Sequence, residues 1–142
     1  MRIAGFSAAP RARIRGFTLI ELMIVVVIVA ILAAIANAGY GFAVVKSRRS
    51  TAKGCVMEGA QYMERVYTTT FTYASAALPP CSSDVTSYYT VGFSGTPDAT
   101  TYTVQAAPQG PQATSDSKCG TLSINQAGVK GITGTGTVAA CW

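Results

Sequence analysis

The segment from Leu22 to Val45 contains no charged residue, and it constrains the fold more than any other part of the chain. A helix needs about 20 apolar residues to cross the hydrocarbon core of a bilayer. The acid at its edge, Glu21, costs about 2.5–3.5 kcal/mol on insertion scales. Thirteen Leu, Ile, Val or Phe residues lie between Phe17 and Ile35, and each contributes about 0.3–0.6 kcal/mol. The apolar contribution is larger, so we expect the segment to insert with Glu21 in it.

The residues around Glu21 form a recognisable pattern. A basic stretch ends at Gly16, and Phe17-Thr18-Leu19-Ile20-Glu21 then leads into the apolar run. This pattern resembles the class III signal of type IV pilins. The resemblance implies a prepilin peptidase that cleaves between Gly16 and Phe17 and methylates the new amine. It also implies that Glu21 pairs with the Phe17 amine of a neighbouring subunit, which would relieve the desolvation cost of the buried acid.

Two other kinds of segment share some of these features. A secretory signal would also combine a basic start with an apolar core, and Ala36-Asn37-Ala38 fits a cleavage site that would leave Gly39 as the first residue. An ordinary single-pass anchor is the second alternative. Neither explains why the acid comes four residues after a Gly-Phe junction and before the apolar run. We therefore favour the pilin interpretation.

The resemblance divides the chain into three parts: a cleaved leader (1–16), a transmembrane and filament-core helix (17–45) and a globular head (46–142). The leader holds four of the 11 Lys and Arg residues, and the positive-inside rule keeps such a segment cytoplasmic. Without the leader, seven basic residues face six acidic ones. A net charge so close to zero gives no sign of a positively charged surface for binding nucleic acid.

Beyond Thr51, apolar residues recur at helical spacing and predict an amphipathic helix with one buried stripe. The helix is expected to end between Thr69 and Ala74, before Pro79-Pro80. A helix from Phe17 to Ala74 would be about 87 Å long, whereas a domain of this size has a radius of gyration of about 13 Å. Its first half is therefore expected to project into lipid or other copies of the chain. The predicted stripe consists of Ala52, Val56, Ala60, Met63, Tyr67 and Phe71.

Pilins of this type usually carry a helix-bending proline two residues before the tyrosine that corresponds to Tyr40. This chain has Ala38 at that position, and glycines flank Tyr40. Since glycine weakens a helix by about 1 kcal/mol relative to alanine, the sequence leaves open whether the helix bends or unwinds near Gly39.

The rest of the chain predicts a small antiparallel sheet, because short segments alternate in polarity or are rich in β-branched and aromatic residues. A long helix on such a sheet gives an α+β fold. Two segments are predicted as polar loops, and the residues Ser82–Ser87 and Pro108–Ser117 are expected to face partners. The predicted loops are Ser75–Thr86 and Pro108–Lys118. The predicted strands are Tyr88–Phe93, Thr101–Ala106, Cys119–Asn125 and Val129–Thr133. Lys46, Arg48, Arg49 and Lys53 are expected to form a solvated helix face.

The four cysteines show no CxxC spacing and the chain has no histidine, so a zinc site is not expected. Disulfides are the default for an exported domain, and a loop of about 20 residues closed in this way contributes about 3 kcal/mol. Of the three possible pairings we favour the sequential one, Cys55–Cys81 with Cys119–Cys141. The second of these loops resembles the C-terminal disulfide loop of type IV pilins.

An enzyme is the weakest functional class. The absence of histidine excludes Ser-His-Asp and Cys-His arrangements. The six acids lack metal-loop or phosphate-loop spacing, and Glu58 and Glu64 are interpreted as surface residues. We therefore expect no catalytic residue, metal or cofactor.

The head is most similar to PilE-type minor pilins, through CGTLSINQAGVKG and the final CW. The resemblance implies a filament subunit for motility, adhesion or DNA uptake. Its implied partners are other pilin subunits, the prepilin peptidase, the inner-membrane assembly machinery and membrane lipid. The implied location is the inner membrane of a Gram-negative bacterium, with a periplasmic head, and then the extracellular pilus. The alternatives are a major pilin, a type II secretion pseudopilin and a DNA-binding competence pilin, although Lys118 and Lys130 are too few to indicate a DNA site.

Overall fold

A computed structural model describes residues 16–142, which fall into two compact units divided between Gly39 and Tyr40. The predicted leader, apart from Gly16, lies outside the described residues. The division falls six residues before the boundary at residue 46 that the sequence analysis placed between helix and head. The second unit therefore includes the last apolar turns before Lys46.

Helix α1 (Leu19–Thr70) is 52 residues long and continuous in secondary structure through Gly39 and Gly41. Its first turn is capped by Thr18, whose Oγ1 accepts a hydrogen bond from the Glu21 N–H at 3.2 Å. Its end lies inside the predicted range. Phe71 follows with a φ of 56° and a side chain that is 78% exposed, so its placement in the buried stripe was wrong. The chain has already left the helix at that residue.

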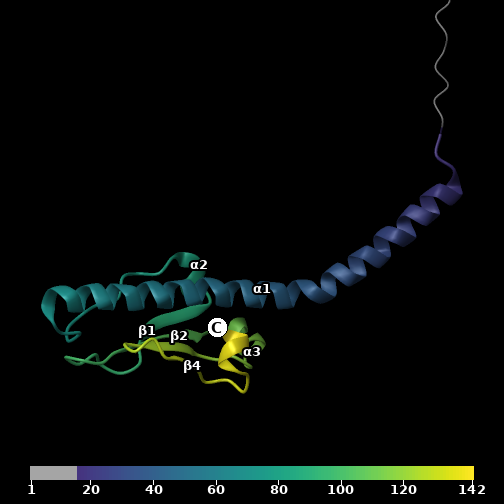
Figure 1. Cartoon of the computed structure of the whole chain (residues 1–142). Coiled ribbons are helices and arrows are strands. Elements are labelled where there is room, and N and C mark those ends of the chain that lie inside the picture. The colour runs from purple at the N-terminus through teal and green to yellow at the C-terminus, as the bar shows by residue number, and fades with distance from the viewer. Residues whose placement is uncertain (1–15) are drawn as a thin grey trace, which may run out of the picture. The chain divides into compact units, whose positions relative to one another are not determined.

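The sheet is an antiparallel meander in chain order, and it confirms the α+β prediction (Figure 1). Its register pairs Val91 with Ala106, Val104 with Ile124, and Leu122 with Ile132. The strands are β1 (Tyr89–Phe93), β2 (Thr103–Pro108), β3 (Leu122–Asn125) and β4 (Lys130–Ile132). Three short helices complete the fold, namely α2 (Ser83–Thr86), α3 (Pro111–Ser115) and α4 (Val138–Cys141).

Strands β1 and β4 begin one residue later than predicted, and β2 and β3 begin two and three residues later. Local hydrogen bonds explain the two larger differences. The Asp98 carboxylate accepts bonds from the backbone N–H groups of Thr100 and Thr101 at 2.7 and 2.6 Å, which keeps Thr101 in a turn. Before β3, the N–H groups of Cys119 and Gly120 both donate to the Asp116 carbonyl, and Gly120 takes a φ of 61°. This turn delays pairing until Leu122.

The main core lies between α1 and the sheet. Ala52, Val56, Ala60 and Met63 are buried as predicted, and they pack in one cluster with Val104, Ala106, Ile124 and neighbouring aromatic residues. Gly59 permits this close approach, because a Cβ there would lie 3.2 Å from Leu78 Cδ2 and 3.4 Å from Val104 Cγ1. The helix face predicted to be apolar is thus the face that contacts the sheet.

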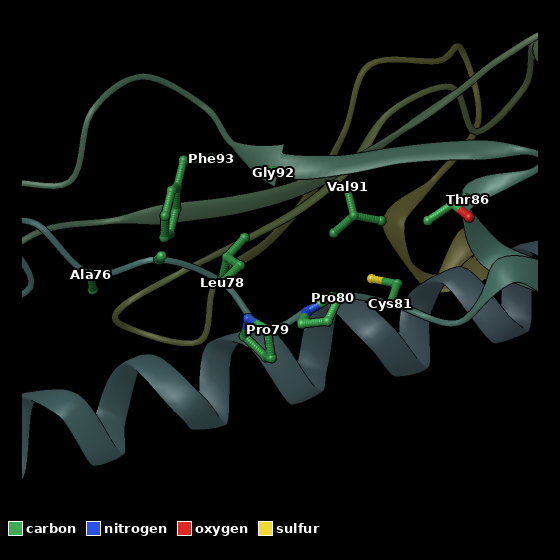
Figure 2. Close-up of a pocket in the computed structure, with 10 residues that line it drawn as sticks. Ala76, Leu78, Pro79, Pro80, Cys81, Thr86, Val91, Gly92 and Phe93 are labelled. Carbon is green, nitrogen blue, oxygen red and sulfur yellow. The ribbon is translucent and has the colours of Figure 1, made fainter.

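A shallow depression of about 520 Å³ lies between β1 and the loop that precedes α2 (Figure 2). Leu78, Pro79 and Cys81 line it from the loop, and Val91 and Phe93 line it from the strand. Its lining contains no charged residue, so it offers no acid, base or metal ligand for chemistry.

Candidate functional site

The N-terminal part of α1 presents one acid on an otherwise apolar surface. Every residue from Gly16 to Asn37 is exposed, including Phe17, whose side chain is 82% exposed, and Glu21. Within the described residues, α1 is the one helix long and apolar enough to cross a membrane. Glu21 lies in its first turn, where the positive end of the helix dipole favours a carboxylate. Among the described residues of its own unit (16–39), this surface has no partner, and it is suited to lipid or to other helices.

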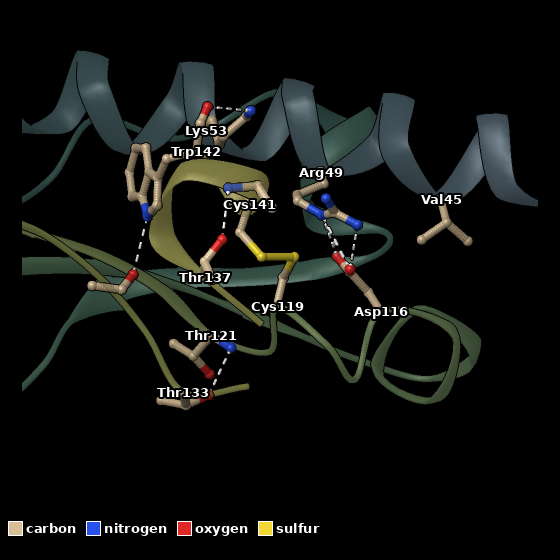
Figure 3. Close-up of a disulfide and its surroundings, with 12 residues drawn as sticks. Val45, Arg49, Lys53, Asp116, Cys119, Thr121, Thr133, Thr137, Cys141 and Trp142 are labelled. Atoms are coloured by element: carbon tan, nitrogen blue, oxygen red, sulfur yellow. Dashed lines mark hydrogen bonds and ion pairs between the residues drawn. A yellow bond between two sulfur atoms is a disulfide. The ribbon is translucent and has the colours of Figure 1, made fainter. Parts of the chain in front are cut away.

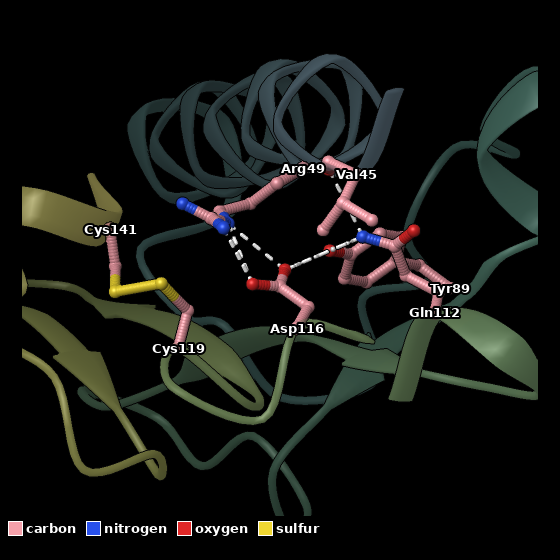
Figure 4. A network of polar contacts seen from close by, with 7 residues as sticks. All are labelled: Val45, Arg49, Tyr89, Gln112, Asp116, Cys119 and Cys141. Atoms are coloured by element: carbon pink, nitrogen blue, oxygen red, sulfur yellow. Dashed lines mark hydrogen bonds and ion pairs between the residues drawn. A yellow bond between two sulfur atoms is a disulfide. The ribbon is translucent and has the colours of Figure 1, made fainter. Parts of the chain in front are cut away.

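A buried polar network ties α1 to α3 at the start of the head (Figure 4). Arg49 binds the Asp116 carboxylate with Nε at 3.0 and 2.9 Å from the two oxygens and Nη2 at 2.6 Å from Oδ1. The Tyr89 hydroxyl donates to Asp116 Oδ2 at 2.7 Å. Gln112 Nε2 donates to Tyr89 Oη at 3.0 Å and to the Val45 carbonyl at 3.1 Å. Three segments distant in sequence therefore meet at one carboxylate.

The electrostatics of this network follow from burial and pairing. Asp116 is 1% exposed and the Arg49 side chain 11%. The hydrogen bond to Asp116 raises the pKa of Arg49. Burial, followed by the hydrogen bond to Asp116, raises the pKa of Tyr89 above its usual value. The guanidinium stays charged and the phenol stays neutral, so the network is a structural clamp with no group poised for proton transfer.

Sequence reasoning missed this clamp. Pro108–Lys118 was predicted to be a polar loop facing partners, yet it contains α3 and two buried residues, Gln112 and Asp116. The available signal was Pro111 after Gly110, since proline is favoured in the first turn of a helix. Similarly, the loop predicted at Ser75–Thr86 ends in the short helix α2.

The four basic residues after the apolar segment were predicted to form one solvated helix face, and the structure differs from this prediction. Arg48 lies over the Tyr88 ring with 3.6 Å between its Cζ and the ring centroid. Arg49 is bound to Asp116, and Lys53 Nζ donates to the Trp142 carbonyl at 3.0 Å. Lys46 alone is exposed in the predicted way. Each of the other three cations has a specific contact with the head.

Two disulfides close the head, and they join the pairs favoured from the sequence. Cys55 in α1 is bonded to Cys81 in the loop before α2, with 5.9 Å between Cα atoms. Cys119 is bonded to Cys141 in α4, with 5.5 Å between Cα atoms (Figure 3). Trp142 then packs against both the main core and the small cluster around Cys119, and its Nε1 donates to the Gly131 carbonyl at 3.0 Å. The chain end is thereby fixed to the sheet.

Acids on α1 show no metal-binding arrangement. Glu58 is exposed, and Glu64 accepts hydrogen bonds from the Tyr73 and Tyr102 hydroxyls at 3.1 and 2.9 Å. Across residues 16–142, no three His, Cys, Asp or Glu side chains come together to hold a metal ion. Glu64 thus has a structural role at the far end of the helix stripe.

Comparison with protein families decides the identity. The model of the family described as type IV minor pilin ComP, DNA uptake sequence receptor, matches residues 38–123, which is more than half of the chain. This chain belongs to that family of minor type IV pilins. A second model, the prokaryotic N-terminal methylation motif, matches residues 11–37 of the pilin. The two matches adjoin and together span the apolar segment and most of the head.

Two solved pilin structures are similar to this chain. The pilin is 24% identical to the non-core minor pilin PilV of Neisseria meningitidis, with a TM-score of 0.50, covering 66% of this chain and 91% of that one. It is 28% identical to a type IV pilin from Shewanella oneidensis, with a TM-score of 0.49, covering 61% and 89% respectively. The likeness to PilV shows the pilin fold. A search of curated protein sequences found no significant match.

The minor pilin is thus a structural subunit that assembles with other pilin subunits into a type IV pilus, as the sequence analysis expected. Its family and fold are structural rather than enzymatic. The matched family is one of minor pilins, so the alternatives of a major pilin and a secretion pseudopilin are not favoured.

Proposed function

We propose that this minor pilin is made as a prepilin, is cleaved between Gly16 and Phe17 by a prepilin peptidase, and enters the filament through Glu21. Before assembly, α1 anchors it in the inner membrane with the head in the periplasm, and the assembly machinery there extracts it. The observation that carries the proposal is the isolation of Glu21 on an exposed apolar helix surface.

The physical argument rests on desolvation. A carboxylate on a helix within lipid or within a bundle of apolar helices keeps a large cost until a cation neutralises it. Cleavage after Gly16 would create a cationic amine on Phe17, four residues from the acid. A helix that docks one subunit out of register would leave both charges unpaired. Glu21 therefore selects the correct register as well as stabilising the contact.

The test compares two variants that each remove one negative charge from α1, Glu21→Gln and Glu58→Gln. Both should be inserted in the membrane at wild-type levels. Glu21→Gln should be depleted at least tenfold from sheared pili when measured by quantitative mass spectrometry, because one unpaired buried charge costs several kcal/mol. Glu58→Gln should be incorporated normally, since its side chain is exposed on the head. Normal incorporation of Glu21→Gln would refute the docking role.

The processing step has its own test. Mass spectrometry of the N-terminal peptide from purified membranes should find a chain that begins at a methylated Phe17. The matched control is Gly16→Leu, which should accumulate as the full-length precursor. A chain that begins at Gly39 would instead indicate cleavage by a signal peptidase and would remove the anchor from the mature protein.

DNA binding is a second candidate function, and the description of the matched family as a DNA uptake sequence receptor favours it. Lys118 lies within the matched residues and is exposed, as is Lys130 beyond them. If these lysines contact phosphates, the affinity for duplex DNA should fall steeply with salt. Lys118→Gln should weaken binding and lower the salt slope by about one, whereas Arg65→Gln should not. Salt-independent binding would argue against this function.

A further inference from the structure

A group of lysine side chains lies at the start of the head, on the side of α1 that faces the C-terminal helix α4. Lys46 and Lys53 are seven residues apart, so they lie on the same face of α1, together with Phe42 and Arg49. Phe42 and Tyr40 are 73% and 72% exposed. Exposed aromatic residues followed by cations are typical of the boundary between hydrocarbon and headgroups.

Trp142 joins a third lysine, Lys130, to this face. Its carbonyl accepts the hydrogen bond from Lys53 Nζ at 3.0 Å. Lys130 Nζ lies 5.0 Å from the centroid of its ring, within the range of a cation–π contact. The tryptophan thus holds Lys53 and Lys130 near each other, although they are 77 positions apart in the sequence.

Two of these cations have no anionic partner within the head. In the part of the chain that the structure describes, the ion pair joins Arg49 to Asp116, and neither Lys46 nor Lys130 pairs with a carboxylate side chain, whereas Lys53 is held by the main-chain oxygen of Trp142. Burial, followed by repulsion from Arg49, Lys130 and Lys46, lowers the pKa of Lys53. A bound anion would offset this repulsion. We call Lys46, Lys53, Lys130 and Trp142 the basal face.

We propose that the basal face docks onto the phosphates of anionic lipid headgroups and holds the head against the membrane before the pilin is assembled. The inference rests on the proposed membrane anchoring by α1. Lipid is favoured over DNA because the cations begin directly after the apolar segment that is proposed to lie in the membrane. Lys46 follows Phe42 by four residues, or about 6 Å of helix rise. Cations are normally concentrated on the cytoplasmic flank of a membrane helix, so their presence after this apolar segment calls for a ligand there.

Trp142 is the single tryptophan of the chain and reports on the basal face directly. The full-length chain would be incorporated into nanodiscs of phosphatidylcholine, with or without phosphatidylglycerol, that contain a lipid with a nitroxide quencher on its headgroup. Quenching of Trp142 should be strong only with phosphatidylglycerol. It should be reversed by high salt, which screens exposed charges beyond about 3 Å at 1 M.

The variant Lys46→Gln/Lys130→Gln keeps the Lys53–Trp142 contact intact. Each cation near an anionic surface favours the docked state roughly fivefold, so this pair should lower the ratio of docked to free heads roughly 20- to 30-fold. Arg65→Gln is the matched control, because it removes an exposed positive charge 19 residues further along α1 than Lys46. A far-ultraviolet spectrum and a melting curve in phosphatidylcholine nanodiscs should be the same for all variants.

The outcomes separate the two proposals. Equal quenching with and without phosphatidylglycerol, or an equal loss in Arg65→Gln, would overturn the docking of the basal face while leaving the anchor intact. Failure of the chain to enter phosphatidylcholine nanodiscs would overturn the anchor, and the docking with it. A Trp142 response to duplex DNA that phosphatidylglycerol does not produce would assign the basal face to DNA and overturn the lipid assignment.

Discussion

At the scale of single residues, Asp116 is the side chain on which the base of the head depends. It accepts hydrogen bonds from Arg49 and Tyr89 while it is 1% exposed. Removing one partner of a buried ion pair is costly because the other charge stays desolvated. Asp116→Asn should therefore lower the free energy of unfolding by about 3–5 kcal/mol, measured by chemical denaturation in detergent.

The exposed Asp84 provides the control, and Asp84→Asn should change stability little. The double variant Arg49→Met/Asp116→Leu should be more stable than Asp116→Asn, because an apolar pair leaves no buried charge. If Asp116→Asn were as stable as Asp84→Asn, the clamp would contribute nothing to the fold.

Two buried phenols predict sensitivity to alkaline pH. Burial is the main cause that raises the pKa of both Tyr89 and Tyr102. Above pH 10 the unfolded chain loses these protons while the folded chain keeps them, so stability falls as pH rises. The fall should be about 1.4 kcal/mol per pH unit for each phenol. Melting curves between pH 9 and 11 should show it. Tyr102→Phe should make the slope shallower without abolishing it, because burial also raises the pKa of Tyr89 and of Tyr73.

At the scale of elements, α1 contains two glycines in the head with opposite surroundings. A Cβ at Gly54 would meet no atom within 4 Å, whereas at Gly59 it would crowd Leu78 and Val104. Alanine in an open helical position gains about 1 kcal/mol over glycine. Gly54→Ala should therefore raise the melting temperature by about 4–8 °C.

Gly59→Ala should fall short of Gly54→Ala, because crowding in a packed core costs about 1–3 kcal/mol. The comparison cancels the intrinsic helix propensity, which is the same for both sites. Equal gains in the two variants would mean that helix and sheet do not approach closely at Gly59.

Local pattern determined how well each element could be predicted from the sequence. The helical spacing of Ala52, Val56, Ala60 and Met63 and the alternation around Val104 and Ile124 are local signals, and both were confirmed. The burial of Asp116 has no such signal. Its partner Arg49 lies 67 positions earlier, and a polar segment that bonds a distant cation has the same composition as a solvated loop.

At the scale of the whole molecule, the C-terminal disulfide connects α3, the sheet and α4. Cys119 and Cys141 are 3% and 1% exposed and form the small core with Leu122. Loss of a native disulfide from a small exported domain costs about 2–5 kcal/mol. Cys119→Ser/Cys141→Ser should therefore melt at least 10 °C lower than the wild type. An unchanged melting temperature would show that packing of Trp142 alone holds the chain end.

The identity of the pilin could be predicted at this scale from Gly16, Phe17 and Glu21, because the signal is contiguous and carries its own chemical logic. Its minor-pilin class required the comparison of the head with known families. The basal face could not be foreseen, because Lys53, Lys130 and Trp142 come together only when the C-terminal helix closes on α1.

Arg49 and Glu64 bond the head at two points of α1 that are 15 residues, or about 22 Å, apart. Between them lies Cys55, whose disulfide with Cys81 joins the helix covalently to the loop before α2. The two polar contacts flank this covalent bond. A pull along the helix loads all three attachments in shear together, and slippage by one turn would require the disulfide to break as well as both polar contacts. The part of the helix between Arg49 and Glu64 and the head should therefore move as one body under tension.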